Sequence, residues 1–439
     1  MSNLIVIKQK LKNFNKKITV SGDKSLSIRW VLFSSIADGV SKAHNLLMSD
    51  DVYAAIDAIK KLGVKVTIKK NLCKIFGNGI NGYKYKKNLV INAQNSGTLG
   101  RLILGLLVSS PTTIKLIGDK SLSKRDFERV TRPLKKFGVT FKLNKNKGLP
   151  LTIKGSNKLK AINYLEDKGS AQCKSSIIFA GMRSTGTTFI KAKKSRNHTE
   201  LLCKYLNLPI NVTTKNNYDF IRVNNVKKIK PLNYNIPSDI SSSAFFMVLT
   251  ALSKKSKLTI KNVNINPSRT GVITILKKMG VIILFKNTKV YKGERIADIH
   301  IKSPGNLKPI NCPKKLNSGA IDEFLVIFLL AAKAKGISNF KDLAELNQKE
   351  SPRLKWGAKI LNEMGIKTIL TNNSIKIFGN PNLEINKKII IKDYLKDHRV
   401  FMTSVIAALS FGGEWYIHDK DSIKTSFPLF LNIVDSLKK

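Results

Sequence analysis

The chain has 439 residues, of which 42% are hydrophobic and 8% aromatic, and its formal net charge is +50. This composition supplies apolar material for about two domains and excludes a disordered chain. No apolar run reaches the roughly 18 residues that a membrane-spanning helix needs, and residues 1–7 enter a short alternating segment without the layout of a signal peptide. We therefore expect a soluble, cytoplasmic protein.

The positive charge is spread along the chain rather than gathered in one stripe. Only 12 of the 78 basic residues are arginine, and aromatic residues do not interleave with the lysines along the sequence. The chain has no RNP-type strand, zinc-finger spacing or basic tail. Compositional bias, together with attraction of small anionic substrates, is therefore favoured over specific nucleic-acid binding. A basic RNA-associated scaffold remains the alternative on charge alone.

Cysteines and histidines lack the spacing of a metal site. The five histidines show no ligand spacing, and the cysteines form neither a CxxC pair nor a disulfide framework. We expect neither a metal nor a cofactor. The four cysteines are Cys73, Cys173, Cys203 and Cys312.

A characteristic helix end recurs along the chain. The first predicted helix, starting at Ala55, ends at Gly63, and the alternating segment 64–68 that follows predicts a short strand. Lysines before a glycine are typical of a helix C-terminus, where cations meet the negative end of the dipole and glycine adopts the left-handed cap. In the copy at 206–210, Pro209 occupies the glycine position. The remaining copies lie at 134–139, 276–281, 361–366 and 433–439.

The spacing of these helix ends predicts six α/β units. The glycine position recurs every 71 to 85 residues, and the last copy stops where the next glycine would fall. Each unit is too short to bury both faces of a sheet alone, so neighbouring units must pack together. Six such units divide naturally into three plus three.

A second repeat relates Gly22–Arg29 to Gly118–Arg125, which match at seven of eight positions. The structural interpretation is two similar helix caps. Both copies nevertheless contain arginine, and a lysine-rich chain is expected to keep arginine for planar, bidentate capture of carboxylate or phosphate. Because helix N-termini favour anions, arginines near predicted helix starts indicate a shared anion-binding cleft. These arginines are Arg29, Arg101, Arg125, Arg196, Arg353 and Arg399.

Carboxylates stand out against this basic background. Asp322 and Glu323 interrupt the apolar stretch 319–328, and Glu350 lies among cations. A carboxylate beside cations has its pKa lowered, and such a group can transfer protons. The structural alternatives are an N-cap for Asp322, at the start of a helix over 322–335, and a plain ion pair for Glu350.

Taken in order, the motifs resemble the enolpyruvyl transferase family, and more closely its shikimate-pathway branch. The branch that acts on a UDP-sugar is less similar, because its loop at 118–125 typically carries a cysteine that this chain lacks. The resemblance covers nearly the whole chain. The matching segments are 22–29, 95–101, 118–125, 169–172, 195–200, 237–242, 266–271, 321–323, 349–353, 397–399 and 424–428.

The resemblance implies a two-domain α/β fold, an inside-out α/β barrel with three βαβαββ repeats in each domain and the active site in the interdomain cleft. One domain, on the shikimate-phosphate side, would span 22–236, and the second would combine 1–21 with 237–439. The implied reaction moves the enolpyruvyl group of phosphoenolpyruvate to the 5-hydroxyl of shikimate 3-phosphate, giving 5-enolpyruvylshikimate 3-phosphate and phosphate. The implied enzyme is a monomer that uses no cofactor, no metal, no specific nucleic acid and no membrane.

The resemblance also implies roles for individual residues. Asp322 would take the hydroxyl proton, and Glu350 with Lys24 would transfer the proton at C3 of phosphoenolpyruvate. The positions matching the shikimate 3-phosphate site are Lys24, Ser25, Arg29, Ser170, Ala171, Gln172, Arg196, Asp322 and Lys349. The positions matching the phosphoenolpyruvate site are Lys24, Gly97, Arg125, Gln172, Arg353, Arg399 and, after a one-residue shift, Lys424.

The chain departs from the family pattern near Arg353 and Arg399. Asn347, Gln348 and Pro352 replace residues of which two are usually charged, and this loss is expected to loosen substrate positioning. Pro352 is expected at the first helical position behind Ser351 as the cap. Phe401 stands where a small residue is usual, so the packing behind Arg399 is expected to differ.

Overall fold

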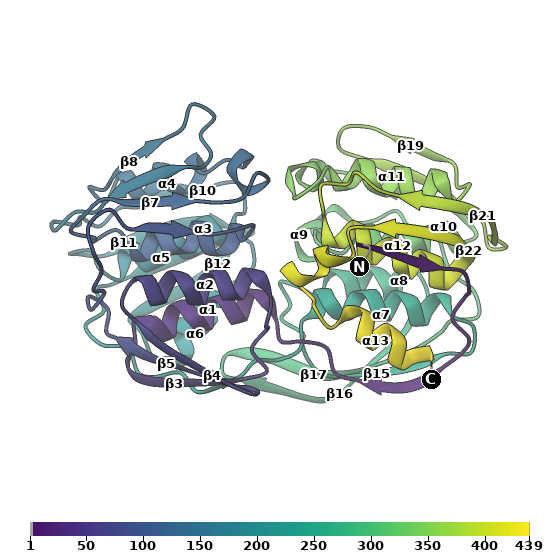
Figure 1. Cartoon of the computed structure of the whole chain (residues 1–439), viewed down its shortest axis with the longest axis horizontal. Coiled ribbons are helices and arrows are strands. Elements are labelled where there is room, and N and C mark those ends of the chain that lie inside the picture. Colours follow the sequence, from purple (N-terminus) through teal and green to yellow (C-terminus); the bar gives the residue numbers. More distant parts are fainter. Residues whose placement is uncertain (1–2, 439) are drawn as a thin grey trace. The chain divides into compact units, whose positions relative to one another are not determined.

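Short strands alternate with helices throughout residues 3–438, which the computed structural model describes (Figure 1). The α/β class predicted from the sequence is confirmed. The chain divides into two units. The N-terminal unit comprises Gly22–Ile236 and Tyr291–Glu294. The C-terminal unit comprises the described residues up to Ser21, Pro237–Val290 and the described residues from Arg295 onward.

The N-terminal unit contains three four-stranded sheets. Its strands are β3 (Asp38–His44), β4 (Lys65–Lys69), β5 (Leu72–Asn78), β6 (Val90–Asn92), β7 (Ile114–Ile117), β8 (Thr140–Leu143), β9 (Leu151–Lys154), β10 (Asn163–Glu166), β11 (Thr188–Lys193), β12 (Ile210–Lys215), β13 (Tyr218–Val223) and β14 (Tyr234–Asn235). The strand orders are β14-β3-β5-β4, β6-β7-β9-β8 and β10-β11-β13-β12. The first pair in each order is parallel and the others are antiparallel. Its helices are α1 (Lys24–Ser35), α2 (Asp50–Lys61), α3 (Gly97–Leu106), α4 (Glu128–Lys135), α5 (Ala171–Gly181) and α6 (His198–Tyr205).

The C-terminal unit also contains three sheets, and the N-terminal strands complete two of them. Its strands are β1 (Leu4–Ile7), β2 (Asn15–Ile18), β15 (Lys257–Asn264), β16 (Ile282–Tyr291), β17 (Glu294–Lys302), β18 (Gly336–Phe340), β19 (Thr368–Leu370), β20 (Ile375–Gly379), β21 (Ile385–Ile391) and β22 (Gly412–His418). The strand orders are β16-β17-β15-β2, β18-β20-β19 and β1-β22-β21. Its helices are α7 (Ile240–Leu252), α8 (Gly271–Lys278), α9 (Asn317–Ala320), α10 (Phe324–Lys333), α11 (Arg353–Glu363), α12 (His398–Phe411) and α13 (Phe430–Lys438).

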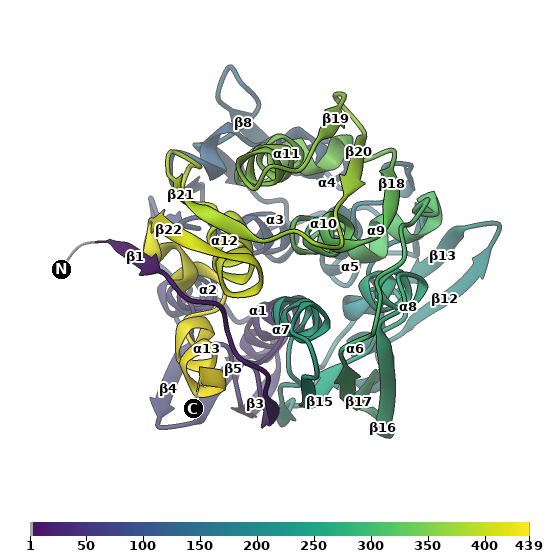
Figure 2. The same ribbon diagram turned by 90° about the vertical axis from the view of Figure 1, so that its right-hand side faces the viewer.

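Three helices of each unit are buried on nearly all sides. In the N-terminal unit these are α1, α3 and α5, and in the C-terminal unit they are α7, α10 and α12 (Figure 2). Helix α3 packs against α1 and α5, whereas α7, α10 and α12 pack against one another. Each unit has its own apolar core around these helices. The first turns of the buried helices therefore have fixed positions within each unit, as an active site requires.

The recurrent helix ends are left-handed caps, with one correction to the sequence analysis. Gly63, Gly280 and Gly365 have φ of 84°, 94° and 83°, and the N–H after each glycine donates to a carbonyl five residues earlier, as in a Schellman motif. In the copy at 206–210 the left-handed residue is Asn207, with φ of 54°, and Leu208 N–H donates to Cys203 O at 3.0 Å. Asparagine, not Pro209, therefore replaces the glycine, because its short polar side chain tolerates this conformation.

Among the described residues, none of the helices combines the length and the apolar character required to cross a membrane.

Candidate active site

Arginine and lysine are used differently in this protein. Six of the 12 arginines are buried, whereas Lys174 is the one buried side chain among the described lysines. The buried arginines are Arg29, Arg101, Arg183, Arg269, Arg353 and Arg399. Four of these six were selected from the sequence as anion-binding candidates. The scarcity of arginine therefore did indicate positions where a planar guanidinium is held by several acceptors.

Arg29 links the starts of three helices in the N-terminal unit. Its Nε donates to Thr199 Oγ1 of α6 at 2.8 Å, and its Nη2 donates to Ser175 Oγ of α5 at 3.1 Å. Burial lowers the pKa of the Arg29 guanidinium to about 10, and the charge of Arg196 contributes to this lowering. The two arginines are thus close enough to interact, and an anion bound near them would relieve their repulsion.

Lys24 is the first residue of α1, which Asp23 caps by accepting the N–H of Leu26 at 2.9 Å. The Lys24 ammonium lies 3.1 Å from Asp51 Oδ2 and its side chain is 22% exposed. In the second copy of the motif, Asp119 likewise accepts the N–H of Leu122, at 2.7 Å, so the two copies share the predicted cap. They diverge afterwards, because the second copy forms only a 3-10 turn over Leu122–Lys124.

A second cluster surrounds the start of α3. Gly97 is the first residue of this helix, and a Cβ built on it would lie 3.0 Å from Arg101 Nη1 and 3.1 Å from Arg125 Nη1. Arg101 Nη1 donates to Gln172 Oε1 at 2.7 Å, and Gln172 Nε2 donates to Thr98 Oγ1 at 3.0 Å. Four helix starts of the N-terminal unit (α1, α3, α5 and α6) therefore carry an interconnected set of cations and hydroxyl groups. Arg101 was an anion-binding candidate from the sequence but was assigned to neither substrate, and Thr98 was not selected.

The loop before α5 depends on a buried carboxylate. Glu166 Oε2 accepts the N–H of Ser170 at 2.9 Å, and Ser170 Oγ in turn caps α5 by accepting the N–H of Cys173 at 3.2 Å. Burial raises the pKa of the Glu166 carboxyl, although the N–H groups of Ser170 and Gly169 act in the opposite direction. Glu166 was not selected from the sequence, because its neighbours in the chain give no sign that it is buried.

In the C-terminal unit, Arg353 contacts three carboxylates. Its guanidinium is 2% exposed and contacts Asp397 through Nε at 2.8 Å and through Nη2 at 3.2 Å. It also donates to Glu350, and its Nη1 lies 3.4 Å from Asp322 Oδ1. Burial alone would lower the pKa of Arg353, but the three carboxylates raise it above its ordinary value. Glu350 thus forms the ion pair that was expected from the sequence as the alternative to a proton-transfer role.

Asp322 also contacts two other predicted residues. Its Oδ1 lies 3.3 Å from Lys349 Nζ, and its backbone carbonyl accepts Arg399 Nη1 at 2.7 Å. Helix α10 starts at Phe324 with Glu323 in the N-cap position, so the predicted helix over 322–335 is shorter at both ends and Asp322 is not its cap. The carboxylate therefore contacts cations rather than capping a helix.

The structure shows how the residues that depart from the family pattern near α11 and α12 are placed. Pro352 occupies the N-cap position and α11 starts at Arg353, so the expectation of Ser351 as the cap is wrong. Ser351 Oγ instead donates to Asp397 Oδ2 at 2.9 Å. Phe401 is fully buried in the core of the C-terminal unit.

One series of linked polar side chains in the C-terminal unit was not predicted from the sequence. Glu323 is buried and accepts a hydrogen bond from Ser241 Oγ, which also accepts Arg269 Nη2 at 2.7 Å. Arg269 Nη2 lies 3.2 Å from Asp239 Oδ1, the carboxylate that caps α7 through Ser241 N–H. The motifs 237–242 and 266–271 contain these residues, but only the fold shows that they meet.

Lys424 is an exposed residue of a turn close to the start of α12. Its side chain is 61% exposed and its Nζ pairs with Asp421 Oδ1 at 3.0 Å, within the 3-10 turn Lys420–Thr425.

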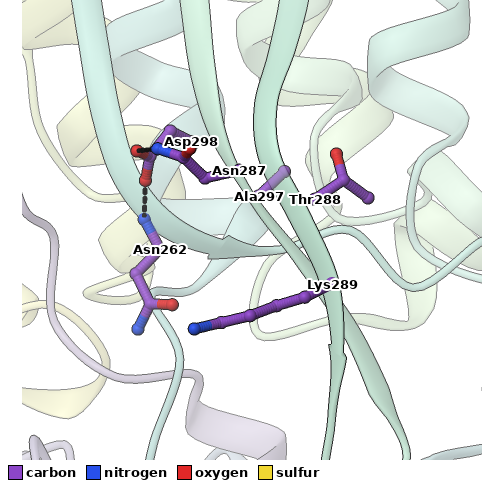
Figure 3. Close-up of a pocket in the computed structure, with 6 residues that line it drawn as sticks. All are labelled: Asn262, Asn287, Thr288, Lys289, Ala297 and Asp298. Carbon is purple, nitrogen blue, oxygen red and sulfur yellow. Dashed lines mark hydrogen bonds between the residues drawn. The ribbon is translucent and has the colours of Figure 1, made fainter.

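The C-terminal unit also has a pocket of about 510 Å³ on the sheet of β15, β16 and β17, shown in Figure 3. Its lining residues include none of the predicted site residues. Asp298 in this pocket accepts Asn262 N–H at 2.9 Å and Asn287 Nδ2 at 2.8 Å. Burial opposes the ionised form, but these bonds and one from Lys261 lower the pKa of the Asp298 carboxyl. Its oxygens are occupied by these structural contacts.

The fold and the two clusters define an α/β protein whose buried helices start beside clustered cations, hydroxyl groups and carboxylates. The family model of EPSP synthase (3-phosphoshikimate 1-carboxyvinyltransferase) matches residues 8–434. The chain is 39% identical to 3-phosphoshikimate 1-carboxyvinyltransferase of Ruthia magnifica subsp. Calyptogena magnifica, over 96% of this chain and 94% of that protein. It is 36% identical to the same-named protein of Caldicellulosiruptor bescii, over 98% of both.

Solved structures agree with these relatives. EPSP synthase from Acinetobacter baumannii matches with a TM-score of 0.87 at 35% identity, over 99% of this chain and 98% of that chain. The enolpyruvyl transferase NikO from Streptomyces tendae matches with a TM-score of 0.76 at 13% identity, over 100% and 98%, and so shares the fold. The chain belongs to the EPSP synthase family, and the resemblance drawn from its motifs is confirmed.

Proposed function

We propose that the protein transfers the enolpyruvyl group of phosphoenolpyruvate to the 5-hydroxyl of shikimate 3-phosphate and releases phosphate, a step of aromatic amino acid biosynthesis. The hydroxyl adds to C2 of the enol as C3 is protonated, and C3 then gives up a proton as phosphate leaves from the tetrahedral intermediate, which restores the double bond. The observation that carries the proposal is the meeting of Asp322, Lys349, Glu350 and Arg353 in one unit of a chain from the EPSP synthase family. These carboxylates can move protons while the cations offset their charge.

The N-terminal unit is proposed to hold the anionic groups of the substrates. Its clustered cations and hydroxyls at helix N-termini match the phosphate and carboxylate groups of both substrates. The residues proposed for shikimate 3-phosphate in this unit are Lys24, Ser25, Arg29, Ser170, Ala171, Gln172 and Arg196. Those proposed for phosphoenolpyruvate in this unit are Lys24, Gly97, Arg125 and Gln172.

The C-terminal unit is proposed to supply the proton-transfer groups. Asp322 takes the proton of the 5-hydroxyl, and Glu350 acts with Lys24 at C3. Lys349 contributes to binding shikimate 3-phosphate, and Arg353, Arg399 and Lys424 contribute to binding phosphoenolpyruvate. Cations that surround a phosphate also stabilise the charge that develops as it leaves.

The test is phosphate release by the purified protein. Release is expected only when both phosphoenolpyruvate and shikimate 3-phosphate are present, together with a product whose mass equals that of the enolpyruvyl ether. Release from phosphoenolpyruvate alone, or no release when both substrates are present, would contradict the proposal. Light scattering on the same sample tests the proposed monomer, and fractionation of source cells tests the proposed cytoplasmic location.

Replacing Glu166 by alanine is expected to raise the Michaelis constant for shikimate 3-phosphate about tenfold, with a smaller change in kcat. The loop that presents Ser170 to Gln172 would lose the acceptor of a charge-assisted hydrogen bond, which contributes about 1.5–3 kcal/mol. Because burial raises the pKa of Glu166, the wild-type Michaelis constant should rise as the pH falls towards that raised pKa. In the Glu166→Gln variant it should stay flat. The exposed neighbour Asp167 provides the control variant, Asp167→Asn. If Asp167→Asn and Glu166→Ala raised the Michaelis constant equally, the role of Glu166 in positioning the loop would be contradicted.

Replacing Gly97 by alanine is expected to weaken phosphoenolpyruvate binding about threefold to tenfold, up to ~1.4 kcal/mol. The new Cβ would press on the guanidinium groups of Arg101 and Arg125, which are flexible ends that can shift. We also propose that glyphosate inhibits competitively with phosphoenolpyruvate, so its inhibition constant should rise in the same variant. Gly305→Ala is the matched control, because nothing lies within 4 Å of a Cβ at that position. Wild-type inhibition by glyphosate that is unaffected by phosphoenolpyruvate would refute the competition.

A further inference from the structure

The outward face of the sheet β10-β11-β13-β12 has an unusual composition. Residues opposite each other in an antiparallel pair share a face, and the register pairs Phe189 with Arg222, Lys191 with Phe220 and Lys193 with Tyr218. Each cross-strand pair on this face of the two central strands therefore joins one aromatic ring and one cation. The strands alternate buried and exposed residues, which places these six side chains on the outside.

The rings remain accessible although cations lie close to them. Phe189 is 43% exposed and Phe220 is 40% exposed. The Arg222 guanidinium lies 5.5 Å from the centre of the Phe189 ring, and Lys191 Nζ lies 5.8 Å from that of Phe220. Exposed aromatic side chains of this size are usually covered in a soluble protein, so their retention on one face needs a reason.

The same face carries no carboxylate on its four strands. The two acidic residues in these strands, Glu166 and Asp219, are both buried and lie on the opposite face. The outward residues of the edge strands are polar, aliphatic or basic: Asn163, Leu165, Asn211, Thr213 and Lys215. The face is therefore uniformly positive and complements a polyanion.

The excess of lysine in the chain does not by itself explain this face. The sheet β6-β7-β9-β8 of the same unit also presents lysines outward, at Lys115, Lys142 and Lys154, but no aromatic ring beside them, because Phe141 of β8 is buried on the opposite face. Aromatic and basic residues do not interleave along the sequence. In this sheet they interleave across β11 and β13, which are neighbours only in the fold.

We propose that this outward face, which we call the β11–β13 face, binds single-stranded nucleic acid. Four-stranded sheets with aromatic side chains on their central strands can stack unpaired bases, while neighbouring cations pair with phosphates. Phe189, Phe220 and Tyr218 provide the stacking surfaces, and Lys191, Lys193 and Arg222 provide the phosphate contacts. This binding is separate from enolpyruvyl transfer, since none of these residues belongs to the proposed active site.

The experiment measures the fluorescence anisotropy of labelled 12-nucleotide oligouridine with the full-length protein at two salt concentrations. Wild-type binding should weaken as salt rises, because phosphate contacts release counterions. The variant Phe189→Ala/Phe220→Ala should bind at least about tenfold more weakly, as expected for the loss of stacked rings. Its enolpyruvyl transfer activity and thermal unfolding should match those of the wild type. Oligodeoxythymidine in a parallel arm distinguishes an RNA-specific site from one that accepts any single strand.

Two control variants and one control ligand make the outcome decisive. Lys115→Ala/Lys154→Ala removes two charges from the neighbouring sheet and should change oligouridine affinity less than threefold. Lys191→Gln/Arg222→Gln keeps the rings but should reduce the salt dependence of binding. Inorganic polyphosphate tests charge alone, because it offers no base to stack. Equal weakening by the ring variant and the Lys115 control, or unchanged oligouridine binding by the ring variant, would overturn the proposal.

Discussion

Replacing Lys24 by methionine is expected to abolish enolpyruvyl transfer, lowering kcat by about 10³-fold or more, while the fold is retained. Methionine keeps an unbranched side chain of similar length at the first residue of α1 but removes the ammonium group. Loss of one preorganised group at a developing charge costs about 10²–10³-fold, and Lys24 is proposed both to bind the anionic substrates and to act in proton transfer. The measurement is steady-state phosphate release, with circular dichroism to verify the fold.

The salt bridge to Asp51 separates the catalytic effect from the structural one. In Lys24→Met, Asp51 loses a cation 3.1 Å away, which is expected to lower the free energy of unfolding by about 1 kcal/mol. The double variant Lys24→Met/Asp51→Asn should recover that stability but remain inactive. Lys120→Met is the matched control, since Lys120 holds the equivalent place in the second copy of the motif but is exposed. Full activity in Lys24→Met would remove Lys24 from the mechanism.

Features that depend on neighbours in the chain were predicted from the sequence. The glycine caps at Gly63, Gly280 and Gly365 follow from local backbone sterics and from the lysines that precede them. The cap by Asp23 is equally local, because the carboxylate reaches an N–H three residues on. These features are set within one turn of chain, so a sequence pattern is enough to locate them.

Features that depend on distant partners were not predicted. Arg353 was selected from the sequence, but not as the partner of the three carboxylates that contact its guanidinium, Asp397, Glu350 and Asp322. Asp397 lies 44 residues away in the chain, and only the packing of α11 beside α12 brings the two together. The burial of Glu166 likewise follows from tertiary packing, which an isolated sequence pattern does not encode.

The environment of Arg353 changes what can be expected of its neighbours. Burial raises the pKa of the Asp397 carboxyl, but the charge of the Arg353 guanidinium contributes to holding it below its ordinary value. The two oxygens of Asp397 contact Arg353, Ser351 and the N–H of Arg399, so this carboxylate has a structural role. Asp322 makes longer contacts and its side chain is 14% exposed, which leaves it as the better placed acceptor of a substrate proton.

Replacing Asp322 by asparagine is therefore expected to lower kcat by about 10²–10⁴-fold, the range for loss of a positioned general base. Asparagine keeps the shape and an oxygen that can face Lys349 and Arg353, so the free energy of unfolding should change little. The Michaelis constant for phosphoenolpyruvate should change less than threefold, because the side chain acts on the hydroxyl of the other substrate. Single-turnover rates with both substrates, quenched and analysed for the tetrahedral intermediate, separate slow addition from slow phosphate loss.

The matched control for this change is Asp342→Asn. Asp342 pairs with Lys314 at 2.7 Å on the surface, so its replacement removes an acidic group without touching the proposed site. It should leave kcat within about twofold of the wild type, because exposed ion pairs contribute little. If Asp322→Asn kept a kcat within threefold of the wild type, the hydroxyl proton would have to leave by another route, and Glu350 would be the next carboxylate to test since it shares the guanidinium of Arg353.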